Sequence, residues 1–154
     1  MAGTNFPPIL GMKADSGIEV RLYTVESGST FIAGALVYLD TSTHTIKECG
    51  TDPSLILGVA YASAAAGLTN SLWGGTAIPV AVLTSNAIVA MASATTAATT
   101  YIGTSYGIVK STNWLVDTSD TTNDRVMVVD VSVSPEIWYV RFVTANLQMT
   151  GLAV

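Results

Sequence analysis

Apolar and polar residues alternate along much of this chain with the two-residue period of β-strands. In residues 18–25 the apolar side chains of Ile18, Val20 and Leu22 point to one side, and mostly polar side chains point to the other. Such alternation over a short segment predicts a half-buried strand. Further segments rich in Val, Ile, Thr, Tyr or Trp are separated by polar turns and are also predicted strands. They are residues 35–39, 45–49, 54–64, 76–84, 87–91, 101–109, 114–117, 125–133 and 137–143.

Three local signals refine these strands. Gly58 lies inside the segment 54–64, where a glycine indicates a bulge or a close approach of another backbone. Pro79 cannot donate a hydrogen bond to a neighbouring strand, so its segment is expected at a sheet edge or just at its start. Residues 92–100 are small and repetitive, and they are predicted to form a loop or one helical turn.

The pattern also predicts which side chains are buried. Trp138, Val140 and Phe142 share one side of their strand and are predicted core residues, whereas the alternate residues are predicted to form a half-exposed face or an interface. Residues 126–129 are apolar on both sides, which indicates a strand covered on both faces.

The elements together predict an all-β protein. About nine short strands recur at intervals of roughly 8–12 residues without a long amphipathic helix, which is typical of a sandwich or barrel. We therefore expect a small β-barrel or a sandwich over residues 18–154; the family resemblance described below adds a β-tulip-like domain to these. A chain of 154 residues is long enough for one such domain with its own core.

Residues 1–17 differ from the rest and are predicted to form an extended N-terminal arm. Pro7 and Pro8 favour an extended backbone without internal hydrogen bonds. Large apolar residues surround them, which is unusual for a solvated tail. The predicted contact residues of the arm are Phe6, Pro7, Pro8, Ile9, Leu10 and Met12. The alternatives are a frayed terminus and an arm that becomes ordered when its apolar side chains dock on a neighbour.

Composition narrows the range of partners. Charged residues make up 11% of the chain and apolar residues 49%, against a usual charged share of about 25%. This balance favours burial of surface between subunits. The net charge is −5 and the six basic residues are scattered, so no nucleic-acid partner is expected. No apolar run reaches the roughly 18 residues of a membrane helix, and residues 1–30 resemble no secretory signal, so synthesis in a cytoplasm without a membrane partner is expected.

Candidate chemistry is sparse. His44 is the one histidine and lies in a predicted hairpin loop, so a solvated role is favoured over a triad or zinc site. Cys49 is the one cysteine and is predicted to be a small buried hydrophobe. Asp117, Asp120 and Asp124 lack the spacing and the glycine of a calcium loop, and a turn with Asx-type hydrogen bonds is favoured. We expect no enzyme activity, no cofactor and no metal.

The tryptophans suggest a different kind of site. Trp114 and Trp138 lie inside apolar strands and are explained by core packing. Trp73 lies in a predicted loop and is the remaining candidate for a contact residue. It would suit a carbohydrate-binding surface or a protein interface.

Two runs carry a resemblance to a known family. The run GALVYLDTSTHTIKECGTDPSLILGVAYASAAAG at residues 34–67 and the run YIGTSYGIVKSTNWLVDTSDTTNDRVMVVDV at residues 101–131 resemble the decoration (cement) proteins of tailed-bacteriophage heads. The resemblance implies a small β domain that forms trimers on the outer surface of an expanded capsid and bridges capsomers. It implies two partners, the major capsid protein and further copies of this chain, and no catalytic residues.

The expected function is therefore that of a structural virion protein. The alternatives are a head-fibre, tail or minor structural protein of a phage, and a carbohydrate-binding β module. A small hydrolase lacks a visible nucleophile and base in the sequence.

Overall fold

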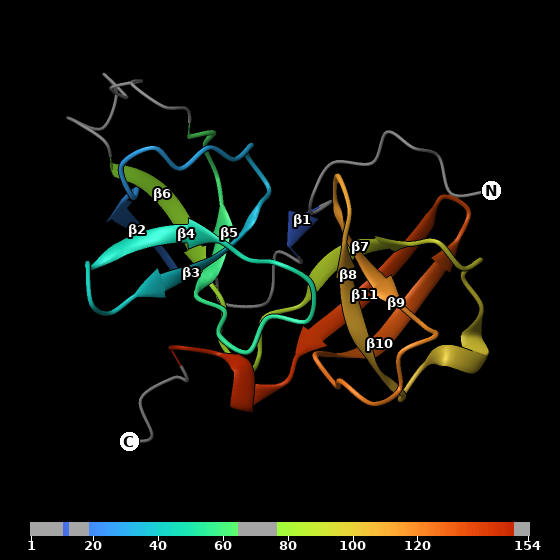
Figure 1. Ribbon diagram of the computed structural model, residues 1–154. Coiled ribbons are helices and arrows are strands. Elements are labelled where there is room, and N and C mark those ends of the chain that lie inside the picture. The colour runs from blue at the N-terminus through green and yellow to red at the C-terminus, as the bar shows by residue number, and fades with distance from the viewer. Residues whose placement is uncertain (1–10, 13–18, 65–76, 150–154) are drawn as a thin grey trace.

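A computed structural model describes residues 11–12, 19–64 and 77–149, and it confirms the all-β class. Two lobes lie side by side, each built from short strands (Figure 1). The helical content of the described ranges is two single turns of 3-10 helix, η1 (Thr99–Tyr101) and η2 (Thr144–Asn146). The turn η1 lies at the end of the segment predicted as a loop or helical turn.

The barrel lobe is a closed sheet. Its strands are β7 (Val89–Ser93), β8 (Ser105–Lys110), β9 (Trp114–Asp117), β10 (Val126–Val133) and β11 (Glu136–Phe142). They follow the order β7-β11-β10-β8-β9 with antiparallel neighbours, and a parallel pairing of β9 with β7 closes the barrel.

A short strand from the start of the chain completes one edge of β7. Strand β1 (Gly11–Met12) pairs antiparallel with Ala90 and Val89, while β9 pairs with the following residues of the same edge. Strand β11 occupies the opposite edge. Residues 11 and 12, which were predicted to belong to the arm, thus form a strand on the barrel lobe of their own chain.

The sheet lobe contains the other five strands. They are β2 (Glu19–Thr24), β3 (Leu36–Asp40), β4 (Thr45–Glu48), β5 (Gly58–Ala60) and β6 (Ala77–Val82), in the order β2-β6-β5-β3-β4. All neighbours are antiparallel.

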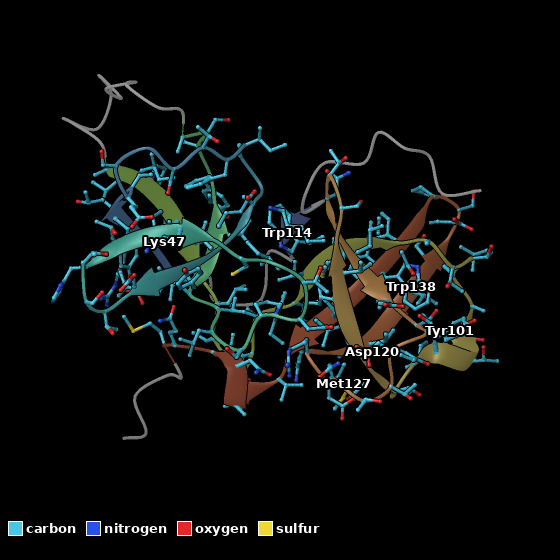
Figure 2. All side chains as sticks on the ribbon, viewed as in Figure 1. Lys47, Tyr101, Trp114, Asp120, Met127 and Trp138 are labelled. Atoms are coloured by element: carbon cyan, nitrogen blue, oxygen red, sulfur yellow. The ribbon has the colours of Figure 1, made fainter. Side chains whose placement is uncertain are left out.

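The sheet lobe curls until its two outer strands meet at one end. Val25, just after β2, forms a parallel bridge with Ile46 on β4. Beside this bridge, the Nζ atom of Lys47 lies 2.8 Å from carboxylate oxygens of both Glu26 and Asp40 (Figure 2 labels Lys47). These hydrogen bonds raise the pKa of Lys47, and they hold the pKa of Asp40 well below its ordinary value. The three charges therefore fasten the end of β2 to β3 and β4.

The apolar core extends through both lobes. Trp138, Val140 and Phe142 are buried as predicted, and Trp138 stacks at a tilt against Tyr101 with a centroid distance of 5.0 Å (Figure 2). Trp114 is also buried, as expected for a tryptophan inside an apolar strand. Aromatic pairs of this kind stabilise a core beyond their buried area.

The prediction that residues 126–129 are covered on both faces was wrong. Val126 and Val128 are buried, but Met127 between them is 44% exposed on the outside of the barrel lobe (Figure 2). A bulge interrupts the pairing between Val128 and Asp130. A bulge inserts one extra residue and reverses the alternation beyond it. Val131 consequently packs against the core, although it shares the parity of Met127.

The edge position predicted for Pro79 was also wrong, because β6 lies between β2 and β5. The carbonyl oxygen of Pro79 accepts a hydrogen bond from the N–H of Tyr61 at 2.9 Å, so the polar backbone atoms of Pro79 face β5. Strand β5 ends at Ala60, one residue earlier. Proline has no N–H to donate to β5, but the ladder between β5 and β6 ends at this position. The missing hydrogen bond therefore costs little, and proline is tolerated in a central strand.

Two segments fasten the lobes together. The first segment follows β11, where the chain crosses to the sheet lobe. There the N–H of Ile56 donates to the backbone carbonyl of Asn146 at 2.8 Å, and the N–H of Gln148 donates to the backbone carbonyl of Ile56 at 2.9 Å. The side chain of Gln148 then pairs with both the N–H and the carbonyl of Leu39, each at 2.7 Å. The second segment is the loop after β4, which extends from the sheet lobe to β8 of the barrel lobe.

Candidate functional site

Three exposed apolar side chains gather on the outer face of the sheet lobe. Val20, Leu22 and Tyr61 are 48%, 51% and 49% exposed. Leu22 is directly opposite Pro79 in the ladder, and Tyr61 is hydrogen-bonded to Pro79 from the other side. Directly opposite residues of an antiparallel ladder point to the same face, so Leu22 and Tyr61 flank Pro79 in one row. Val20 is two residues from Leu22 and shares that face. We call the exposed side chains of Val20, Leu22 and Tyr61 the β2 patch; Pro79 lies buried between them.

The prediction of a half-buried strand at β2 was wrong: five of its six residues are exposed, including Val20 and Leu22 on the apolar side that the alternation marks, and only Tyr23 is partly buried. The inward side chain is Tyr23, which packs against the core. Its burial raises the pKa of its phenol. Because a tyrosine carries a large apolar ring, it fills the core from the side that the alternation marks as polar.

The outer edge of β2 carries unpaired backbone groups. Strand β6 occupies one edge of β2, and among the described strands none pairs with the other edge before its end, where the Val25–Ile46 bridge joins it to β4. On this strand the Nε atom of Arg21 donates to the carboxylate of Glu19 at 2.6 Å, and both side chains are more than half exposed. The site thus combines an apolar face, an open edge and two opposite charges.

A second cluster forms where the lobes meet. The N–H of Asp52 donates to the carbonyl of Ile108 at 2.9 Å, and the N–H of Ile108 donates to the Asp52 carboxylate at 2.8 Å. Two residues along β8, the N–H of Lys110 donates to the hydroxyl of Thr51 at 3.0 Å, and its ammonium donates to Glu48. The loop after β4 is thereby paired to β8 like a short extra strand.

Two carboxylates meet at this junction. A Cβ atom on Gly107 would lie 2.8 Å from a carboxylate oxygen of Asp52 and 2.7 Å from one of Asp120, so a side chain at this position would displace one or both carboxylates. Asp120 also accepts hydrogen bonds from the backbone N–H groups of Thr122 and Asn123 and from the Asn123 side chain. Figure 2 places Asp120 on the barrel lobe. Sequence reasoning missed this pair, because the two residues meet only through tertiary folding.

The two carboxyl groups titrate in opposite directions. Burial raises the pKa of Asp52 above its ordinary 3.8, and the charge of Asp120 raises it too, against the lowering effect of the Ile108 N–H. Hydrogen bonds from Asn123 and Thr122 lower the pKa of Asp120 to about 2. Asp52 therefore reduces stability as the pH rises above about 4, and Asp120 reduces it as the pH falls from about 4 to about 2. Both carboxyl groups lie at the junction between the lobes, so their titration affects the stability of that junction.

The residues considered for catalysis are far apart. His44 is exposed at the tip of the β3–β4 hairpin, as predicted, with a left-handed backbone (φ 59°). Cys49 lies at the other end of β4, roughly 16 Å away at 3.3 Å per residue. It is buried as predicted, and burial raises the pKa of its thiol to about 12. A thiol with such a pKa is a poor nucleophile.

The acidic turn after β9 has the predicted Asx-type hydrogen bonds. Asp117 accepts from the N–H of Ser119 at 3.0 Å, and Asp120 accepts from that of Thr122 at 2.9 Å. Within the described ranges no three His, Cys, Asp or Glu side chains are grouped as a metal site would need.

None of the predicted contact residues belongs to the β2 patch. Phe6, Pro7, Pro8, Ile9, Leu10 and Trp73 lie outside the described residues. Met12 belongs to β1, which is paired with β7.

No protein-family model and no curated protein matches this sequence. In the part of the chain that the structure describes, no helix is long and apolar enough to cross a membrane.

Proposed function

We propose that this chain is a structural protein of a phage virion that binds the outside of the expanded capsid and stabilises it by bridging capsomers. The observation that carries the proposal is the β2 patch, an exposed apolar face on a two-lobed body whose junction is hydrogen-bonded on both sides. The sequence resemblance to head decoration proteins gives the class of partner, the major capsid protein. The proposal includes a homotrimer on the capsid, and it assigns no catalysis to the chain.

The energetics fit a contact that is weak at each site and repeated many times. Burying one large apolar side chain contributes about 1.5–3 kcal/mol, and those of the β2 patch are already half-buried, so each adds roughly half of that. Three such side chains give about 2–5 kcal/mol before the costs of association. Multivalent attachment through an oligomer then converts modest affinity per site into high occupancy of the shell.

The N-terminal arm supplies a second contact in this proposal. Residues 6–10 directly precede β1 in the sequence, and β1 is paired with β7 of the barrel lobe. The β2 patch belongs to the sheet lobe. Contacts from both lobes would let one copy touch two places on the shell.

Binding should depend little on salt, because the basic residues are scattered and the patch is apolar. Many ion pairs would instead make the affinity fall steeply between low and moderate ionic strength. A fall of about a thousandfold over that range would contradict an apolar contact.

The direct test is saturation binding to purified, expanded heads that lack decoration. A Val20→Ser/Leu22→Ser variant should bind about tenfold more weakly, since tenfold corresponds to about 1.4 kcal/mol. Met127→Ser, which alters an exposed apolar residue on the barrel lobe, is the matched control and should bind like the unaltered chain. Equal binding of all three proteins would exclude the β2 patch as the contact. Binding to tails in labelled micrographs, with bare heads, would overturn the proposed location.

A further inference from the structure

We propose that the loop of residues 50–54 is a latch that lifts from β8 while both lobes stay folded, and that ionisation of Asp52 favours the lifted state. The hydrogen bonds that join Ile56 to Asn146 and Gln148 keep the lobes together while the latch is open. The latch is a property of the folded chain alone, so it does not depend on the proposed capsid binding. It makes the junction tighter in acid and looser at neutral pH.

Both ends of the loop are fixed to the sheet lobe, and its middle reaches the barrel lobe. At the base, the N–H of Cys49 donates to the carbonyl of Leu36 at 2.8 Å, and the thiol of Cys49 donates to the carbonyl of Leu55 at 3.6 Å. At the tip, Thr51 and Asp52 make three hydrogen bonds with the backbone of β8. The loop can therefore lift by breaking the bonds at its tip while those at its base persist. Local opening of this kind is expected of segments that few contacts hold in place.

The backbone of Asp52 is strained in the closed latch. Its φ is 45°, in the left-handed region that residues other than glycine adopt at a cost in free energy. Aspartate tolerates this region better than most residues, so the strain is modest. Lifting relieves the strain, which favours opening, whereas Pro53 beside it is buried, which favours closing. The charge on Asp52 can therefore shift the balance between the two states.

In the closed latch the Asp52 carboxyl group lies beside that of Asp120, which belongs to the barrel lobe (Figure 2). One oxygen of each lies within 2.8 Å of the position that a Cβ atom on Gly107 would take. A protonated Asp52 can donate a hydrogen bond to the Asp120 carboxylate, whereas two charged carboxylates repel each other at close range. The proton on Asp52 thus decides whether this contact between the lobes is attractive or repulsive.

Other charged groups surround the pair without reversing this effect. Burial raises the pKa of Asp52 more than the charge of Arg125 lowers it, and the ammonium of Lys110 is bonded to Glu48. The pKa of Asp120 is about 2, so this carboxylate stays charged from pH 4 to pH 8. The charged side chains carried by the elements around the latch are Glu48 of the sheet lobe and Lys110, Asp117, Asp120, Asp124 and Arg125 of the barrel lobe.

The direction of the pH effect follows from the raised pKa of Asp52. A proton stabilises the closed latch fully below the ordinary pKa of 3.8, and this stabilisation is lost as the pH rises through the raised value. The hydrogen bonds of the segment after β11 join backbone groups and the amide side chain of Gln148, and none of these groups titrates in this range. This second connection should therefore hold the lobes together at both acid and neutral pH.

Hydrogen exchange of the full chain at pH 4 and pH 7, at increasing urea concentrations, tests the latch. The amides of Ile108 and Lys110 face the loop and are called the latch amides. They should exchange through an opening that depends little on urea, because a local opening exposes little surface. After correction for the intrinsic exchange rate, their protection should fall about threefold or more from pH 4 to pH 7. The amides of Ile56 and Gln148 should remain more protected than the latch amides at both pH values.

Two variants assign the pH effect to the carboxyl group of the latch. Asp52→Asn keeps an oxygen that can accept from the Ile108 N–H but carries no charge, so it should abolish the fall in protection. Asp130→Asn, which alters an exposed carboxylate that bonds within its own strand, is the matched control and should retain the fall. The latch does not exist if its amides show the urea dependence of global unfolding. Equal protection at both pH values, or a fall that persists in Asp52→Asn, would overturn the role of Asp52. Capsid binding is scored in a separate assay, so each proposal can fail alone.

Discussion

Replacing Gly58 with alanine tests how tightly the centre of the sheet lobe is packed. Strand β5 lies between β3 and β6, and a Cβ atom on Gly58 would lie 2.1 Å from the carbonyl oxygen of Ala81 and 2.9 Å from a methyl group of Val80. An ordinary contact between carbon and a carbonyl oxygen is about 3.3 Å or longer. The two central strands would have to separate by roughly 1 Å, as the difference between these distances indicates. A backbone carbonyl cannot rotate away as a side chain can.

The cost follows from that displacement. Overpacking a core costs about 1–3 kcal/mol or more, and weakening two ladder hydrogen bonds adds roughly 0.5–1.5 kcal/mol each. We expect Gly58→Ala to lower the free energy of unfolding by about 3–5 kcal/mol. With a urea dependence of about 2 kcal/mol per molar, the unfolding midpoint should fall by roughly 2 M.

The measurement is equilibrium urea unfolding followed by tryptophan fluorescence and circular dichroism. Gly50→Ala is the matched control, because no atom lies within 4 Å of the position that its new methyl group would take, and its φ is not positive. This control should change stability by less than about 0.5 kcal/mol. Gly103→Ala also meets open space but has a φ of 85°, so it should cost about 1–2 kcal/mol through backbone strain alone. If Gly58→Ala unfolds at the same urea concentration as Gly50→Ala, the strands are not in close contact and the register at β5 is wrong.

Three further outcomes are expected. Asp52→Asn should raise stability at pH 7 and flatten the decline in stability above about pH 4, because the raised pKa of this partly buried acid shows that the fold penalises its charged form. Unfolding curves from pH 4 to 8 that match those of the unaltered chain would contradict this. Gln148→Ala should cost about 1–3 kcal/mol in urea unfolding, since it leaves the N–H and carbonyl of Leu39 without their partner, and Gln148→Glu should recover only the N–H bond. Deleting residues 1–10, which spares β1, should leave the melting temperature nearly unchanged. The same deletion should weaken capsid binding about tenfold or more, which corresponds to roughly 1.4 kcal/mol. Unchanged capsid binding would show that the arm makes no contact with the capsid.

Local patterns predicted the strands well because strand signals are local. Turn residues and β-branched runs placed β9 at its observed bounds and most other strands within a few residues. Trp138 and its alternate neighbours were assigned to the core correctly, since no bulge interrupts β11 on that side. The prediction of a close backbone approach at Gly58 was also correct.

The errors arose where tertiary contacts, and not the local sequence, determine which residues are exposed or paired. The bulge after Val128 reverses the faces of β10, and a bulge leaves no clear mark in a run of valines. Pro79 is central because β5 stops beside it, which depends on the length of another strand. The exposure of Val20 and Leu22 follows from Tyr23 turning inward. Asp52 and Asp120 come together only when both lobes are folded against each other, so no spacing in the sequence predicts this contact.

The pairing of β1 with β7 has a consequence for the order of events during synthesis. All five strands of the sheet lobe lie between these two strands in the sequence and are complete by Val82. On a ribosome the sheet lobe can therefore fold while β7 is still unmade, and residues 11–12 must wait for it. Closing a long loop adds little entropic cost once the intervening lobe is folded. Hydrogen exchange on nascent chains stalled at increasing lengths should show protection of β5 and β6 at lengths at which β1 is still unprotected; protection of β1 first would refute this sequence of steps. Strand β1 is thus synthesised first but pairs with its neighbour only after the sheet lobe has formed.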